Sequence, residues 1–269
     1  MTSDFQETYR GDVKAWECDV VEHFTVAYYY EKFEAAAWRY LRESGVDPRT
    51  ARTTDCYTRY HAELRKGDLF HIETGLIETG LRPVIAHRLF NSDTGMLCTT
   101  MEQTLDGIPL KGSPAEWDGP AREERAPAPK SAKWVRAGTD VVRPSDLDWT
   151  GKLGLGGLIH QFSGSGFHAL ATIGMSPSYL RENRRGFSTF EFQIEMDHWP
   201  EGGDLVHVES TVAHVGSSSI RMVHRLVDTT RKKRLAELSQ FGVHLDLDAR
   251  KPTRLPENIL EQARALLGG

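Results

Sequence analysis

The chain has 269 residues, enough for one large domain or two small ones. Apolar residues make up 39% and charged residues 26% of it, an ordinary composition for a soluble protein. The formal net charge of -5 gives no electrostatic basis for binding nucleic acid or an anionic membrane, so neither is expected as a partner.

Cysteine usage and the N-terminus indicate a cytoplasmic protein. The three cysteines are far apart and form no CxxC pair, which argues against a disulfide framework. The first residues are polar and acidic and lack the apolar core of a signal peptide. No run approaches the roughly 18 apolar residues that span a bilayer.

The first half reads as a strand, a long helix and four more strands. The strand is Tyr9–Glu17, with Val13 and Trp16 as apolar members. From Tyr30 onward apolar residues recur at helical spacing, and Gly45 is a typical residue to end such a helix. Turn signals then separate four strand-like runs, expected as an antiparallel meander: Thr54–Arg65, Leu69–Ile77, Pro83–Phe90 and Met96–Leu105.

Residues 106–133 are rich in Gly, Pro and charge, which predicts a surface linker with little apolar burial. The same order then starts again, with a strand at Trp134–Arg143 and a helix around Ile159–Ile173. Strand-like runs and a short C-terminal helix complete the second half; the strands are Ser188–Met196, Leu205–Val215, Ser219–Val227 and Leu235–Leu247. We therefore expect a first repeat at 1–105, a linker at 106–133 and a second repeat with the C-terminal helix at 134–269.

Identities at a nearly constant spacing support the duplication. Asp19 and Asp148 are 129 residues apart (148 − 19 = 129), and Phe33 and Phe162 have the same separation. The segment Gly67–Glu73 returns as Gly203–Glu209 at a separation of 136. The sequence thus predicts two copies of one α+β unit.

The junction between the first strand and helix resembles the 4-hydroxybenzoyl-CoA-type acyl-CoA thioesterases. That family has Asp-x-x-Gly-His-x-Asn with a Tyr at the tenth place, and here Asp19 and His23 are followed by Thr25 and Tyr29. The resemblance covers both halves and implies a double hot-dog fold, in which each sheet wraps around its helix. It also implies an acyl-CoA substrate, and we expect no cofactor.

Both copies depart from the family pattern. Glu22 stands where the family prefers Gly. The second copy keeps Asp148 and Gly151 but has Lys152 at the His place, Gly154 at the Asn place and no Tyr. Because the first copy keeps more of the polar residues, we expect its junction to be the active one. No His-x-x-x-His spacing with a third ligand suggests a metal.

Thioester hydrolysis needs a polarised carbonyl and an activated water or nucleophile. Backbone N–H groups at the start of a helix can hold an oxyanion, and the junction aspartate can act as general base or nucleophile. The candidate catalytic residues are Asp19, His23, Thr25 and Asp148. The candidate substrate-binding residues are Val26, Tyr28, Tyr29, Gly151 and Lys152.

Other interpretations remain open. An aspartate before a helix is often only a cap, and the repeated histidines His71/His207 and His87/His224 are expected to be structural. The basic run Arg231–Arg234 is read as a hairpin tip, with contact to CoA phosphates as the alternative. A non-catalytic binder of acyl thioesters and a hot-dog hydratase or dehydratase are the competing functions. The acyl group and the assembly of double hot-dog units into a homo-oligomer are left open.

Overall fold

The computed structural model describes residues 4–19 and 22–268. By contacts the chain divides into two compact units, Met1–Arg122 with Pro144–Ile159, and Glu123–Arg143 with His160–Gly269. The short segment that leads into the second helix therefore belongs to the first unit, although the sequence repeat assigns it to the second copy.

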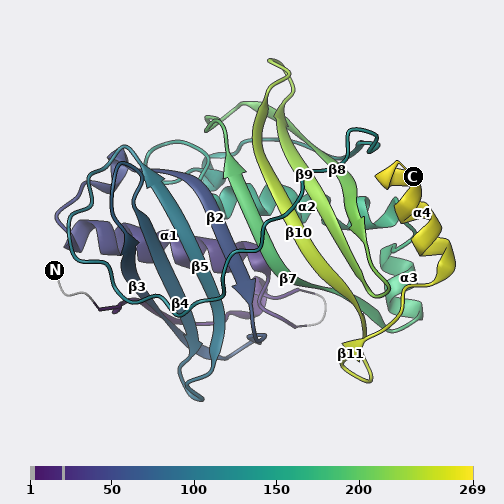
Figure 1. Ribbon diagram of the computed structural model, residues 1–269, viewed down its shortest axis with the longest axis horizontal. Coiled ribbons are helices and arrows are strands. Elements are labelled where there is room, and N and C mark those ends of the chain that lie inside the picture. The colour runs from purple at the N-terminus through teal and green to yellow at the C-terminus, as the bar shows by residue number, and fades with distance from the viewer. Residues whose placement is uncertain (1–3, 20–21, 269) are drawn as a thin grey trace. The chain divides into compact units, whose positions relative to one another are not determined.

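In the first unit an antiparallel sheet packs on one long helix (Figure 1). The strands occur in the order β1-β3-β4-β5-β2, so only the last three expected strands form a meander and β2 pairs with β5 instead of β3. The bounds of these elements are β1 (Gln6–Asp12), α1 (Val26–Glu43), β2 (Arg52–Tyr60), β3 (Leu69–Glu78), β4 (Val84–Asn91) and β5 (Leu97–Asp106). This is the hot-dog arrangement that the sequence predicts.

Helix α1 presents its apolar stripe to the sheet. Phe33, Ala37 and Leu41 are buried at helical spacing, and Ala37 and Leu41 belong to a core cluster that includes Ile85 of β4. The helix begins four residues before Tyr30 and ends at Ser44, with Gly45 in the left-handed region at φ 75°. Glycine reaches that conformation without steric cost, which explains the stop.

Two sequence predictions about the first unit are wrong in detail. The first strand ends at Asp12, and Ala15–Glu17 forms a turn of 3₁₀ helix on which Trp16 is 73% exposed, so Trp16 is not a core residue. The linker also buries more apolar surface than expected, because Ile108 and Leu110 join the core cluster beneath α1. Both errors arise from tertiary packing that a local pattern does not encode.

The second unit repeats the order, with strands in the sequence β6-β8-β9-β10-β7. Its elements are β6 (Val135–Val141), α2 (Leu155–Ala171), α3 (Pro177–Glu182), β7 (Arg185–Met196), β8 (Leu205–Val215), β9 (Ser219–Asp228), β10 (Arg234–Asp246), β11 (Lys251–Pro252) and α4 (Glu257–Leu267). Ala169, Leu170 and Ile173 pack against strands β8 and β9 and against α4, which closes this core. The short α3 was not expected from the sequence. Within the described ranges no helix is long and apolar enough to cross a membrane.

Candidate functional site

The first junction is a tight loop closed by backbone hydrogen bonds. Cys18 and Phe24 form a β-bridge, and the Asp19 N–H donates to the His23 carbonyl at 2.8 Å. The exposed Asp19 carboxylate accepts a hydrogen bond from the His23 backbone N–H at 3.0 Å. Val20 and Val21 lie outside the described residues. The Asp19 side chain therefore holds the loop closed in this structure.

The second junction has the same backbone geometry. Leu147 and Leu153 form the equivalent bridge, and the Asp148 N–H donates to the Lys152 carbonyl at 2.8 Å. Here the half-buried carboxylate accepts hydrogen bonds from the Thr150 N–H at 2.7 Å and from the Thr150 hydroxyl at 2.5 Å. The two loops are thus structural counterparts, as the 129-residue spacing predicts.

The position between Asp and His explains the family's preference for glycine. Gly151 adopts φ 74° and Glu22, its counterpart, adopts φ 63°. This left-handed conformation is free for glycine but unfavourable for a residue with a Cβ. Glu22 is held there while its carboxylate pairs with Lys66 at 2.8 Å.

The remaining candidates of the first junction have mainly structural contacts. The His23 imidazole pairs with Glu63 at 3.2 Å, and the His23 backbone N–H donates to the Asp19 carboxylate. Thr25 precedes α1 without a side-chain capping bond, and Val26 begins the helix. Tyr29 is 3% exposed, with its ring 4.5 Å from that of Phe24, which places it in the core, whereas Tyr28 is half-buried.

The second junction lies against α1 within the first compact unit. Glu31, Glu34 and Trp38 share one face of α1, and the Trp38 ring is 5.1 Å from that of Trp149. A Cβ at Gly156 would come within 2.7 Å of Glu31 Cγ, and one at Gly154 within 3.0 Å of Asp148 Cβ. The glycines therefore let α1 approach the first turn of α2.

Glu34 projects into this contact. A Cβ at Gly154 would lie within 2.4 Å of one Glu34 carboxylate oxygen, and the Gly156 N–H donates to the other at 3.4 Å. Burial raises the pKa of Glu34 to about 7, and the charge of Asp148 adds to the rise. Hydrogen bonds from the N–H groups of Gly156 and Leu155 oppose it. A carboxyl with such a pKa can take up and release a proton near neutral pH.

One of the two repeated histidine pairs, His87 and His224, is structural, as the sequence predicts. His87 is fully buried between the Thr74 hydroxyl at 2.8 Å and the Gln103 side-chain oxygen at 3.1 Å. His224 has the equivalent contacts with Ser210 and Gln240 at the same two distances. Burial lowers the pKa of each histidine to about 4, so both are neutral at physiological pH.

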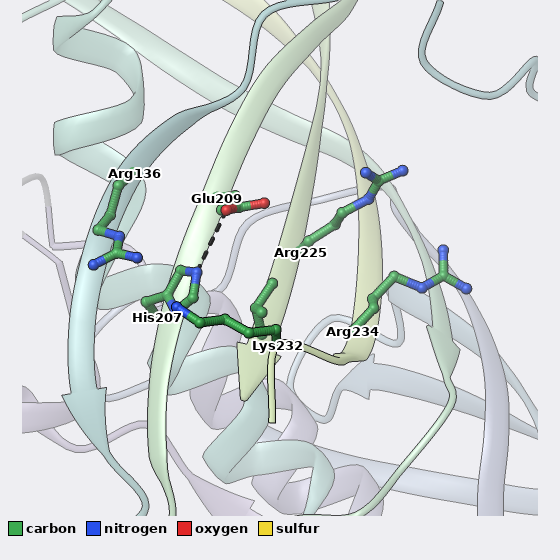
Figure 2. Close-up of a pocket in the computed structure, with 7 residues that line it drawn as sticks. Arg136, His207, Glu209, Arg225, Lys232 and Arg234 are labelled. Carbon is green, nitrogen blue, oxygen red and sulfur yellow. Dashed lines mark hydrogen bonds and ion pairs between the residues drawn. The ribbon is translucent and has the colours of Figure 1, made fainter. Parts of the chain in front are cut away.

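An open basic pocket lies on the sheet of the second unit, where Arg136, Arg225, Lys232 and Arg234 surround it (Figure 2). Arg234 is already paired with Asp197 and Glu195, and Arg225 with Glu237. Figure 2 shows Glu209 beside His207, and their side chains are 3.4 Å apart. The cations line a surface that attracts anions.

Comparison with known proteins agrees with the two-copy organisation. A family model described as the thioesterase-like superfamily matches residues 13–134 and again 142–263. The chain belongs to the thioesterase-like superfamily. The second match begins 129 residues after the first (142 − 13 = 129), the spacing that relates the two junctions. No curated protein sequence matches the chain.

Several solved structures of thioesterases share the fold. An acyl-ACP thioesterase from Bacteroides thetaiotaomicron has a TM-score of 0.67 at 10% identity, covering 90% of this chain and 100% of that one. A putative oleoyl thioesterase from Lactobacillus plantarum has a TM-score of 0.66 at 11% identity, covering 90% and 97%. The 12:0-ACP thioesterase from Umbellularia californica has a TM-score of 0.64 at 12% identity, covering 88% and 94%.

Membership of the thioesterase-like superfamily makes thioester hydrolysis the reaction class that the fold supports. Sequence reasoning identified the junctions but missed Glu34, because its helix face looks polar and solvent-exposed in the sequence. The only available signal was indirect: three glycines at 154, 156 and 157 require a close neighbour for the start of α2. Among the described residues no cluster of three or more His, Cys, Asp or Glu side chains is arranged to hold a metal ion.

Proposed function

We propose that this protein hydrolyses an acyl thioester, with acyl-CoA as the expected substrate, to give a free acid and a thiol. The reaction is placed at the second junction, where the first turn of α2 meets α1. The N–H groups of Leu155 and Gly156 would hold the carbonyl oxygen as negative charge develops on it. One observation supports this placement: a carboxyl oxygen of Glu34 already accepts a hydrogen bond from the Gly156 N–H, so a donor is available to an oxygen atom at this position.

Asp19 and Asp148 remain the two candidate catalytic carboxylates that the sequence pattern identifies. Asp148 is half-buried and faces the start of α2, whereas Asp19 is exposed and caps its own loop. The surroundings of Asp148 therefore favour the second junction, although the sequence pattern favours the first. Gly151 and Lys152 would line the entrance to this site. Thr25, Val26 and Tyr28 would lie at the corresponding positions of the first junction.

Thiol release from a panel of CoA esters tests the activity directly. The panel covers short-chain, long-chain, aryl and quaternary-ammonium acyl groups, with one acyl group also presented on acyl carrier protein. We expect release of free thiol from at least one ester. Stabilisation by these esters without turnover would show a non-catalytic binder and contradict the proposal.

Paired variants assign the reaction to a junction. Asp19→Asn and Asp148→Asn are assayed on the same ester across pH 5–9. We expect Asp148→Asn to change the rate or its pH dependence. Loss of hydrolysis in Asp19→Asn together with a wild-type profile in Asp148→Asn would move the site to the first junction.

A further inference from the structure

The pocket on the sheet of the second unit carries more positive than negative charge. Seven residues line it, among them four cations, one carboxylate and the imidazole of His207. Its volume is about 310 Å³, at the lower end of the ~300–1,000 Å³ typical of small-molecule sites. The pocket therefore has the size for a small ligand, and its charge favours an anion.

Two of the four cations have no partner within the described ranges of the chain. Arg225 and Arg234 both pair with the carboxylate of Glu237, which lies outside the pocket lining. The side chains of Arg136 and Lys232 form no ion pair or hydrogen bond with any described residue. Their charges are therefore available to a ligand.

The pocket lies on the face of the sheet opposite to the part of α2 that packs on it. The ring of Phe162 in α2 is 6.1 Å from that of His224, and side chains alternate along a strand, so the neighbouring Arg225 points to the other face. On that face His207 is 3% exposed, and Figure 2 shows Lys232 extending from its hairpin towards this ring. The site uses none of the residues assigned to thioester hydrolysis, so the inference goes beyond the proposed function.

The equivalent face of the first unit does not have this charge. The strand registers place Arg136 and Glu7 at equivalent positions, 129 residues apart (136 − 7 = 129), and β9 and β10 are related to β4 and β5 by 137 residues. The counterparts of Arg136, Lys232 and Arg234 are Glu7, Gly95 and Leu97. Arg225 alone has a cationic counterpart, Arg88. The basic pocket therefore belongs to the second copy only.

The hairpin backbone does not explain the lysine at position 232. Lys232 adopts φ 56°, in the left-handed region, and its counterpart Gly95 adopts φ 70°. Glycine reaches this region without steric cost, whereas a residue with a Cβ does not. Glycine would thus make the same turn more favourably in the second copy. What lysine adds is a cation beside the pocket.

We propose that this pocket is a binding site for a small anion that carries a diphosphate group. Guanidinium and ammonium groups form charge-assisted hydrogen bonds with phosphate oxygens, so Arg136 and Lys232 would contact the ligand directly. These two cations come from β6 and from the β9–β10 hairpin, and each can bind one of two linked phosphates. Arg225 and Arg234 remain paired and add positive potential. Free nucleotides and the nucleotide part of coenzyme A share this chemistry.

Isothermal titration calorimetry with inorganic pyrophosphate and with ADP tests the site. Arg136→Gln and Lys232→Gln each remove one unpaired charge. The matched control is Lys233→Gln on the same hairpin, because Lys233 is exposed and is not among the residues that line the pocket. We expect the affinity for pyrophosphate to fall at least about 10-fold in the first two variants and less than about 2-fold in the control. The affinity should also fall as salt is raised.

Lys232→Gly separates binding from folding. It restores the residue of the first copy, so it should raise the urea midpoint and still weaken pyrophosphate binding as Lys232→Gln does. The proposal is wrong if neither pyrophosphate nor ADP binds to the wild-type protein, or if Arg136→Gln and Lys232→Gln bind them as tightly as the wild type. Binding of an acidic protein through these residues, without binding of pyrophosphate, would also overturn it.

Turnover measurements distinguish the two sources of the diphosphate. If CoA displaces pyrophosphate and Arg136→Gln raises the KM of the best CoA ester at unchanged kcat, the diphosphate is that of the substrate. If the KM is unchanged, the ligand is a separate nucleotide or polyphosphate. Both results support the site. If the wild-type protein hydrolyses no ester, the proposed function fails, while pyrophosphate binding still decides the present proposal.

Discussion

Replacing Glu34 by glutamine should stabilise the protein in a pH-dependent way. Folding raises the pKa of this carboxyl from 4.5 to about 7, so the folded state binds the proton more tightly than the unfolded state. Stability linked to Glu34 is therefore fully present below pH 4.5 and is lost as pH rises through 7. The two pKa values differ by about 2.5, which corresponds to ~3 kcal/mol at pH well above 7. Glutamine has no charge to bury and should not show this loss.

The measurement is urea unfolding of the wild-type and Glu34→Gln proteins at pH 5 and pH 8. Part of the loss already occurs at pH 5, so the advantage of the variant should grow by about 2–3 kcal/mol between these two conditions. Glu43→Gln serves as the control, because its carboxylate is exposed and its advantage should not depend on pH. An advantage of Glu34→Gln that is equal at both pH values would refute the interpretation of Glu34 as a buried carboxyl without a compensating cation.

Three further changes test other parts of the structure. Gly154→Ala places a methyl group within 2.4 Å of a Glu34 oxygen and directly before the N–H groups proposed to hold the carbonyl oxygen, and this crowding should lower kcat about 100-fold. Glu22→Gly should raise the urea midpoint by relieving the left-handed backbone, whereas Gly151→Ala at the counterpart should cost ~1 kcal/mol. Acid should destabilise the fold through His87 and His224: burial lowers each pKa from 6.5 to about 4, so their stability is present above pH 6.5 and falls by ~3 kcal/mol each toward pH 4.

Each of these changes has an internal control. Gly164→Ala on α2 has no neighbour within 4 Å and should keep wild-type turnover, so an equal loss in both glycine variants would contradict the steric argument. If both positions share the same backbone strain, Glu22→Gly should raise the free energy of unfolding and Gly151→Ala should lower it. Two changes of the same sign would contradict this shared strain. For the histidines, His224→Gln should reduce the destabilisation measured between pH 7 and pH 4.5.

The duplication and the fold could be predicted because they depend on local patterns. The apolar stripe of α1, the helix stop at Gly45 and the repeat of the segment Gly67–Glu73 are all visible along the chain. The order of the strands in the sheet could not be predicted from such local patterns. Nothing in the segment Arg52–Tyr60 indicates that it pairs with β5 and not with the next strand along the chain. Pairing partners are selected by tertiary packing, which periodicity does not report.

Only part of the candidate site could be predicted from the sequence, for the same reason. Asp148 lies in a motif that can be read along the chain, but Glu34 is 114 residues earlier (148 − 34 = 114). On α1 it lies off the apolar stripe, where a carboxylate normally faces water. The contact with the first turn of α2 buries it, and burial, not sequence context, gives it a pKa near neutrality. The site therefore became visible only when both helices were placed.

Fusing two copies into one chain permits this asymmetry. In a symmetric dimer of single hot-dog domains, any residue placed on the central helix appears at both equivalent sites. A buried carboxyl such as Glu34 would then reduce the free energy of unfolding twice. In a tandem chain the copies diverge independently, and here one helix has Glu34 while its counterpart has Ser163. Ser163 is exposed, so Ser163→Glu should leave the free energy of unfolding at pH 8 nearly unchanged, and a loss as large as the one expected for Glu34 would contradict the argument from burial.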